Sequence, residues 1–235
     1  MSKVFPEQKT DGKYWVSISD MMSGLMMVFL FISIAYMINV VKERDTIKEI
    51  AITYNRLQND LYDDLYNEFK DDLKKWNALI DRQSLSVRFE SPDVLFEKGS
   101  YQLKNEFKII LDDFFPRYVA ILTSNKYKDD IEEIRIEGHT SSEWRIDVPE
   151  DLAYFYNMQL SQDRTRSVLE YVMNLTNVSG SKDWLKQYLT ANGLSSSKLI
   201  IVDGKENKDK SRRVEFRVKT NSEKRIVKII SESKQ

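Results

Sequence analysis

The chain has 235 residues, 31% of them charged, and a formal net charge of −1. A nucleic-acid binder normally carries a strongly basic face, so this balance argues against a nucleic-acid partner. The absence of cysteine excludes disulfide bonds and thiolate metal sites. The charged fraction is high for a protein made mainly of membrane spans, and we therefore expect one anchor and one water-exposed domain.

An apolar run over residues 16–41 predicts a transmembrane helix. Its core, residues 18–38, has 21 residues, which at about 1.5 Å each match a hydrocarbon layer of roughly 30 Å. The run is too long for a signal peptide and lacks a small-residue cleavage site, so we expect a retained anchor. The flanking basic residues predict a cytoplasmic N-terminus over residues 1–15, with Lys3, Lys9 and Lys13 before the run and Lys42 and Arg44 after it.

Asp20 is the only charged residue within this run. A carboxylate inside a span costs on the order of 2.5–3.5 kcal/mol by insertion scales, which favours a functional reason for its presence. Spacings of three residues place Ser17 and Ser23 on the same helical face as Asp20. We predict that these three residues form an ion-translocating site, used by protons or by sodium ions. The alternative is that the Asp20 carboxylate has no function and only extends to the nearby membrane–water interface. This is less favourable for aspartate than for lysine or arginine, because its side chain is short.

A lone helix cannot enclose an ion path, so a multi-span partner must line the other side. Residues 42–80 then predict one long polar helix, because they contain neither proline nor glycine. Apolar residues recur in it at steps of three and four, as in a coiled coil. We favour a helical stalk that pairs with a second copy, and the alternative is a helix that packs on its own domain. The stripe includes Leu57, Leu61, Leu65, Phe69, Leu73 and Trp76.

The remaining chain alternates between strand-like and helix-like patterns. We expect strands over residues 85–89, 131–137, 199–202 and 213–219, and helices over 104–123, 152–175 and 182–192. Strands separated by helices of this length predict an α+β sandwich with the helices on one face of a sheet. A basic tail, residues 221–235, follows this domain.

Two motifs point to a binding site. Gly138-His139-Thr140-Ser141 follows a predicted strand, and Asn157-x-x-Leu160-Ser161-x-x-Arg164 opens a predicted helix. Helix N-termini attract carboxylates, and an arginine one turn further on could hold a ligand carboxylate through two hydrogen bonds. Taken alone, the pattern equally fits a capped helix with a surface arginine.

These motifs, with Phe96-x-x-Gly99-Ser100-x-x-Leu103 and the string SRRVEF at 211–216, resemble the OmpA-like peptidoglycan-binding domain over residues 84–220. In that family the arginine and an aspartate after Gly-His-Thr bind the carboxylate and amine ends of diaminopimelate. The resemblance implies an OmpA-like α/β sandwich that binds peptidoglycan through Arg164, Asn157, Leu160, Tyr156, Thr140 and Ser141. Ser141 stands where the family usually has aspartate, and Glu143 or Asp147 could supply the missing carboxylate.

A span with one aspartate, followed by this domain, resembles the MotB-type stator subunits of ion-driven motors. The string SDMMSGLM at 19–26 resembles the branch of that superfamily found in Zorya anti-phage defence. The resemblance implies a dimeric, single-pass inner-membrane protein with its C-terminal domain in the periplasm, inside a pentamer of a ZorA/MotA-like partner in a 5:2 complex. Proton flow through Asp20 would rotate that partner in response to phage.

Two other functions are compatible with the same residues. One is a flagellar-type stator subunit, and the other is a passive envelope tether that binds peptidoglycan. Catalysis is the weakest hypothesis, because the chain has no phosphate-binding loop, no cysteine, and a single histidine that lies within the Gly-His-Thr-Ser motif. We therefore expect no enzyme activity, no catalytic residue, no metal site and no cofactor.

Overall fold

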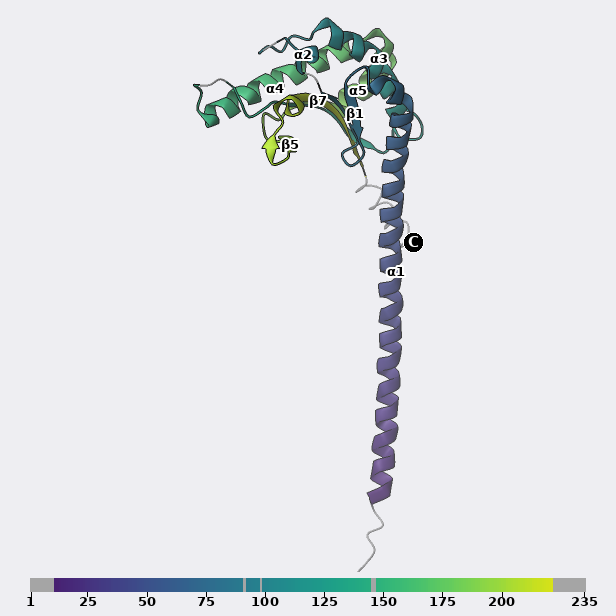
Figure 1. Cartoon of the computed structure of the whole chain (residues 1–235). Coiled ribbons are helices and arrows are strands. Elements are labelled where there is room, and N and C mark those ends of the chain that lie inside the picture. The colour runs from purple at the N-terminus through teal and green to yellow at the C-terminus, as the bar shows by residue number, and fades with distance from the viewer. Residues whose placement is uncertain (1–10, 91, 98, 145–146, 222–235) are drawn as a thin grey trace, which may run out of the picture. The chain divides into compact units, whose positions relative to one another are not determined.

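The computed structural model consists of two compact units, residues 1–53 and residues 54–235 (Figure 1). It describes residues 11–90, 92–97, 99–144 and 147–221. Residues 1–10 of the expected cytoplasmic segment and residues 222–235 of the expected basic tail lie outside the described residues. Helix α1, Asp11–Leu73, is continuous over 63 residues and contributes to both units.

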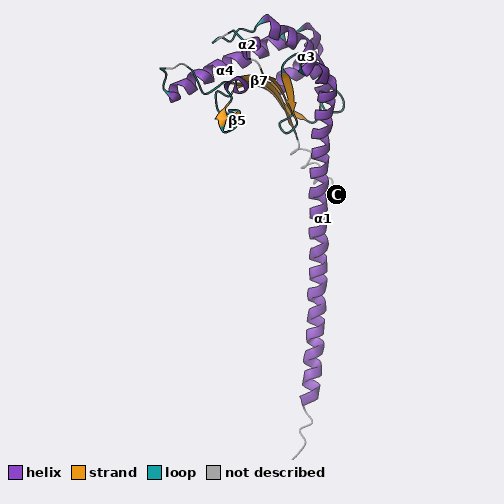
Figure 2. Ribbon diagram, in the orientation of Figure 1, coloured by secondary structure: helices purple, strands orange, loops and turns teal. Residues whose placement is uncertain are grey.

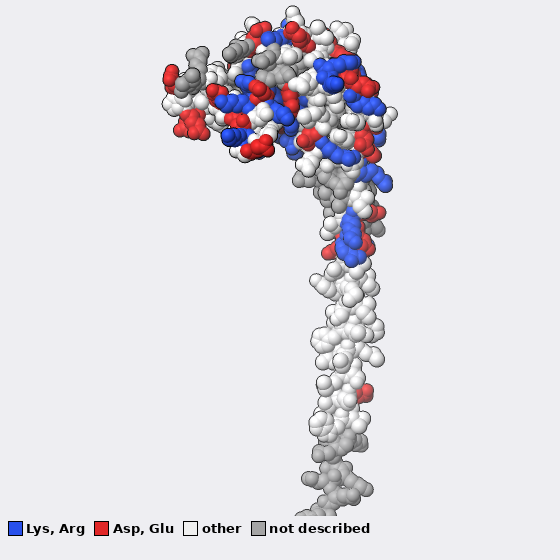
Figure 3. Space-filling view, viewed as in Figure 1, with Lys and Arg blue, Asp and Glu red and all other residues white. Residues whose placement is uncertain are grey.

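Unit 1 contains the expected membrane span. Within the described part of the chain, Trp15–Glu49 of α1 is the one helical stretch long and apolar enough to cross a membrane. Its large apolar side chains are exposed, and Figure 3 shows an almost uncharged surface along its part before Lys42. Such a surface is stable against lipid and unstable in water, which agrees with the predicted transmembrane helix.

The C-terminal end of α1 differs from the sequence prediction. The pattern predicts helix as far as residue 80, whereas α1 ends at Leu73 and Ala78–Asp81 form strand β1. Asn77 makes the turn with φ of +46°, a left-handed conformation that asparagine tolerates better than most residues. The backbone of β1 pairs antiparallel with β2, Ser86–Glu90. In residues 78–81 the hydrogen bonds to β2 take the place of helical ones. The apolar pattern that predicted a helix as far as residue 80 therefore extends beyond the end of α1.

Unit 2 is built on a five-stranded sheet with the order β1-β2-β7-β3-β4. Strands β3 and β4 are parallel, and the other neighbours are antiparallel. The remaining strands of this sheet are β3, Ile131–His139, β4, Leu189–Gly193, and β7, Arg213–Thr220. The strands predicted at 85–89, 131–137 and 213–219 are thus confirmed as members of one sheet.

Helices α3, Asn105–Leu122, and α4, Glu150–Met173, confirm the two longer helix predictions and lie on the same side of the sheet (Figure 2). The helix predicted at 182–192 is wrong in its second half, because α5 ends at Tyr188 and β4 follows. The short elements are α2, Pro92–Leu95, the 3-10 helix η1, Thr176–Ser181, α5, Lys182–Tyr188, and α6, Lys208–Ser211.

The strand predicted at 199–202 also differs from the structure. Ile201–Val202 form β5, which pairs with β6, Lys205–Glu206, in a separate two-stranded ribbon. Both apolar residues of β5 are exposed, 56% for Ile201 and 42% for Val202. The local β propensity was therefore real, but these residues do not contribute to the core sheet.

The core of unit 2 includes the last turns of α1. Leu61, Leu65 and Phe69 are fully buried. The ring of Phe114 on α3 joins them to the sheet, with centroid distances of 5.1 Å to Phe69 and 5.1 Å to Phe216 on β7. The apolar stripe from Leu61 onward thus belongs to the core of its own domain and not to a pairing face. For these residues the favoured paired stalk is wrong and the alternative is correct.

Ion pairs hold the same part of α1 against α3. The Arg117 guanidinium donates to the carboxylates of Glu68 and Asp72, at 2.7 and 3.0 Å, and to the Glu68 carbonyl. Burial alone would lower the pKa of Arg117, but its hydrogen bonds to the carboxylates raise it. Asp64 accepts hydrogen bonds from Lys126 and Tyr127. These contacts fix the register of α1 on the domain.

We expect Leu65→Ala to lower the free energy of unfolding of unit 2 by about 2–5 kcal/mol, because it leaves a cavity in the core. The neighbouring Tyr66 is 44% exposed, so Tyr66→Ala is the matched control and should cost less than about 1 kcal/mol. Urea unfolding of the full chain in detergent, followed by tryptophan fluorescence, measures both. Equal small effects would show that α1 does not belong to this core.

Candidate functional site

The predicted binding motifs meet where strands β3 and β4 end against α4. A Cβ atom on Gly138 would lie 2.6 Å from the Thr165 side chain and 2.8 Å from the Ser161 carbonyl oxygen. Gly193 on β4 is equally close to the backbone of Gln162. Any larger residue would push the helix off the sheet. The two glycines therefore allow the direct contact that brings the Gly-His-Thr-Ser loop to the middle of α4.

Asn157 holds that loop in place. Its side-chain amide is buried and donates to the carbonyl oxygens of Ser141, at 3.2 Å, and Glu143, at 3.4 Å. Ser161, one turn further along α4, accepts a hydrogen bond from the backbone N–H of Ser195. Asn157 thus positions the loop, and its amide is not directed to solvent.

The other predicted site residues differ in exposure. Thr140 and Ser141 are buried, and the Thr140 hydroxyl has no hydrogen-bond partner among the residues described. Leu160 is half-buried. Tyr156 is 43% exposed, and its ring lies tilted against that of Trp144 with a centroid distance of 5.4 Å. The structure therefore places Tyr156 at the surface and Thr140 within the loop.

Arg164 has the electrostatic features of an anion site. Its Nε donates to the Ser100 carbonyl at 2.9 Å, and its guanidinium lies 4.8 Å from the centroid of the Phe96 ring. No carboxylate pairs with it in the part of the chain that the structure describes. Burial, and then the positive charge of Arg212, lowers the pKa of Arg164 to about 10. Both effects favour a bound anion, which would restore the interactions that the guanidinium lost on leaving water.

The carboxylates proposed to replace the usual aspartate are not paired with Arg164. Glu143 forms an ion pair with Lys208 at 2.7 Å, and Asp147 is exposed. At Glu143 this hydrogen bond from Lys208 lowers the carboxyl pKa. Of the two carboxylates proposed for a ligand amine, Glu143 is thus already paired with Lys208, and Asp147 is exposed.

Sequence reasoning missed a buried ion network on the other face of the sheet. Glu215 accepts hydrogen bonds from Arg213 at 2.6 Å, from Arg88 at 2.9 Å and from Ser86 at 2.9 Å. Burial alone would raise the pKa of Glu215, but the Arg213 hydrogen bond and the charges of Arg213 and Arg88 lower it to about 2. The signal was present in β7, where Arg213, Glu215 and Arg217 alternate with core residues.

His139 lies beside this network. Its Nε2 is 3.8 Å from a Glu137 carboxylate oxygen and 3.9 Å from a Glu215 oxygen, and neither ring nitrogen has a hydrogen-bond partner among the described residues. Burial lowers the pKa of His139. The three side chains could ligate a metal ion by spacing. However, Arg213 and Arg88 already neutralise Glu215, so we assign the cluster to the ion network.

The predicted ion site lies on a regular stretch of α1. Ser17, Asp20 and Ser23 are all exposed and share one face by their spacing. The Ser23 hydroxyl donates to the Ser19 carbonyl at 2.8 Å, and so it is satisfied by its own helix. In the described chain no side chain covers this face, and a partner would have to complete an ion path here.

Comparisons with known proteins agree on the family. The model of the OmpA family matches residues 95–223. The chain is 51% identical to the Zorya protein ZorB of Escherichia coli strain Crooks, over 99% of this chain and 98% of that protein. It is 25% identical to the Zorya protein ZorB of a second Escherichia coli strain, over 89% of this chain and 81% of that protein. A crystal structure of a putative MotB-like protein from Desulfovibrio vulgaris is 19% identical, with a TM-score of 0.45, and covers 76% of this chain and 98% of that one.

The Glu215 network predicts an acid limit to stability. Because the pKa of Glu215 is lowered from 4.5 to about 2, its contribution is complete above pH 4.5 and is lost as the pH falls through about 2. At 1.36 kcal/mol per unit, the contribution is about 3 kcal/mol. Glu215→Gln should remove it and flatten the pH dependence between pH 4.5 and 2, as measured by urea unfolding. Glu132→Gln, which breaks an exposed pair with Lys219, is the control and should leave the profile unchanged.

Proposed function

The chain belongs to the OmpA family and to the family of the Zorya protein ZorB, and from that premise we propose that it is the wall-anchored, ion-conducting subunit of a membrane motor in anti-phage defence. The observation that carries the proposal is the combination of two unpaired charges of opposite kind in one chain. One is Asp20 on the exposed face of the membrane span, and the other is Arg164 in the folded domain.

Asp20 is the ion carrier in this proposal. Its carboxyl takes a proton from the periplasmic side and releases it to the cytoplasm, with Ser17 and Ser23 on the same face. One charge that crosses the membrane field gains about 2.3 kcal/mol per 100 mV. A ZorA/MotA-like multi-span partner supplies the rest of the path, as five copies around two of these spans. Each change between neutral and charged Asp20 alters which surface of the partner the span binds most strongly. The partner ring then rotates relative to the span.

Arg164 anchors the chain to peptidoglycan. With Nε bound to the Ser100 carbonyl, the two terminal nitrogens of the guanidinium are available to a carboxylate of diaminopimelate. Asn157 keeps the adjacent loop in position, and in this proposal Tyr156, Leu160, Thr140 and Ser141 complete the binding region. Because Ser141 carries no charge and Glu143 pairs with Lys208, the carboxylate of the ligand is recognised more strongly than its amine.

The proposed wall anchor and the proposed ion carrier are both needed for rotation. Ion flow can rotate a partner only against a fixed point, and the cell wall provides one. The orientation that this requires has the N-terminus in the cytoplasm and the folded domain in the periplasm of the inner membrane. The identity of 51% to a ZorB protein over 99% of this chain favours defence over the flagellar alternative.

Asp20→Asn should abolish protection against phage while the complex with the multi-span partner still assembles, because the amide keeps the shape but cannot exchange a proton. Plaque counts on cells that carry the complete defence system measure protection, and co-purification measures assembly. Asp45→Asn is the control, because Asp45 is exposed and pairs only with Arg44. Full protection by Asp20→Asn would overturn the proton mechanism and favour a passive tether.

Arg164→Ala should weaken binding of the full chain to purified peptidoglycan by about 10- to 100-fold, as expected for the loss of charged hydrogen bonds worth about 1.5–3 kcal/mol. Co-sedimentation with isolated cell walls measures this. Arg166→Ala is the matched control on the same helix, because Arg166 is exposed and pairs with Glu170. If both variants sediment like the unaltered chain, Arg164 is not the anchor.

A further inference from the structure

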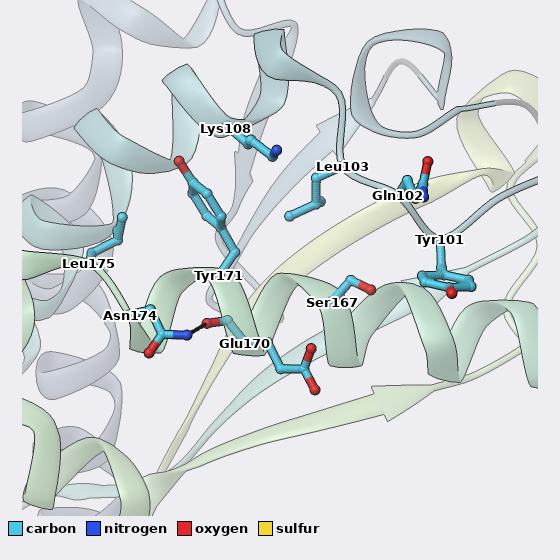
Figure 4. A pocket seen from close by; sticks show the side chains of 9 residues that line it. All are labelled: Tyr101, Gln102, Leu103, Lys108, Ser167, Glu170, Tyr171, Asn174 and Leu175. Carbon is cyan, nitrogen blue, oxygen red and sulfur yellow. Dashed lines mark hydrogen bonds between the residues drawn. The ribbon is translucent and has the colours of Figure 1, made fainter.

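A second hollow lies beside the Arg164 site. It is a groove of about 540 Å³ between the start of α3 and the C-terminal half of α4 (Figure 4). This volume lies within the range of small-ligand sites. Its walls are mixed, with tyrosine and leucine side chains beside hydroxyl and amide groups. The side chains that matter below are Tyr101, Leu103, Lys108, Ser167 and Tyr171.

Lys108 is the unpaired charge of this groove. Its ammonium group is directed into the groove and lies 5.9 Å from the centroid of the Tyr171 ring (Figure 4). Within the described ranges, no carboxylate lies at ion-pair distance from it. Lys108 is therefore free to pair with an anion that enters the groove.

The acidic residues near the groove are occupied elsewhere. Glu170 pairs with Arg166 at 2.9 Å, and Figure 4 shows its carboxylate directed away from Lys108. Asp112 accepts a hydrogen bond from the Tyr171 hydroxyl at 2.7 Å, which also fixes the orientation of that ring. Glu170 also lines the groove, but its charge is compensated by Arg166, whereas no ion pair compensates the charge of Lys108 among the described residues.

The groove is continuous with the Arg164 site along the chain and along α4. The Ser100 carbonyl accepts the Arg164 hydrogen bond, and the next residue, Tyr101, lines the groove. Ser167 and Tyr171 follow Arg164 on α4 at spacings of three and seven residues, which places them on the same face. At about 1.5 Å per residue, Tyr171 lies about 10 Å along the helix axis from Arg164.

We propose that this groove binds the second free carboxylate of the peptidoglycan stem peptide, the α-carboxylate of the γ-linked glutamate that precedes diaminopimelate. The assignment rests on the proposed function, in which Arg164 holds the terminal carboxylate of diaminopimelate. An extended γ-glutamyl-diaminopimelate unit has eleven bonds between these two carboxylate carbons and spans at most roughly 13 Å. A partly bent unit therefore covers the about 10 Å along α4 from Arg164 to the Tyr171 end of the groove. Tyr101 and Leu103 then contact the methylene groups between the two charges.

The test uses two synthetic tripeptides, L-alanyl-γ-D-glutamyl-meso-diaminopimelate and the same peptide with the glutamate α-carboxylate amidated. Calorimetry with the full chain in detergent measures their affinities. Amidation should weaken binding to the unaltered chain about fivefold, the size expected for one partly exposed ion pair. Lys108→Met should weaken binding of the acid form by the same factor and should bind both peptides equally. Lys108→Arg should retain the preference.

Two further variants separate this inference from the proposed function. Arg164→Ala should lose binding of both peptides. Lys186→Met removes an exposed lysine that pairs with Asp183 and does not line the groove, so it should leave both affinities unchanged. If the unaltered chain binds both peptides equally well, the groove assignment is overturned and the Arg164 anchor stands. If it binds neither peptide, recognition of diaminopimelate is overturned as well.

Discussion

A charged side chain that is removed from water needs a partner of opposite charge. In this protein the charges that have such a partner stabilise the fold, and those that lack one are candidates for binding. The Glu215 carboxylate accepts hydrogen bonds from two guanidinium groups and one hydroxyl, and these bonds stabilise the sheet. Arg164 is half-buried and has no carboxylate partner in the described chain. Lys108, which lines the groove, is also half-buried and also has no ion-pair partner there. Asp20 lies on an apolar span where lipid offers no partner at all. Glu215 is structural, and Arg164, Lys108 and Asp20 mark the proposed contacts with wall and ion.

The core of the folded domain places the second constraint on the chain. Phe114 packs at 5.1 Å from Phe69, from Phe89 and from Phe216, so α1, α3 and two strands share one aromatic cluster. Arg117 adds charged hydrogen bonds between α3 and the last turns of α1. The helix that carries the predicted membrane span therefore ends as an element of the OmpA-family domain. Before Leu57, described apolar side chains of α1 such as Ile47 and Ile52 are 66% and 61% exposed and free for pairing.

Much of the fold could be predicted because local patterns and tertiary needs agree. The two long helices, three of the five main strands and the span all follow from periodicity, charge and length. The errors at the ends of two predicted helices have one cause. At residues 78–81 and 189–193, pairing with β2 and β3 overrides a helical pattern, and pairing partners distant in sequence leave no local signal. The stripe of α1 was ambiguous in the same way, since a coiled-coil face and a core face have the same spacing.

The sequence by itself determined the residue types that the function needs. It showed a lone carboxyl in a span and a strand-end motif next to a helix with Arg164, because composition and spacing are local properties. Only the tertiary structure decided which charges have partners. It paired Glu143 with Lys208, buried Glu215 among arginines from two strands, left Arg164 beside Phe96 without an anion, and opened the groove at Lys108. Whether two charged groups form an ion pair depends on the distance between them in the folded protein. That distance is set only when the sheet and its helices pack together.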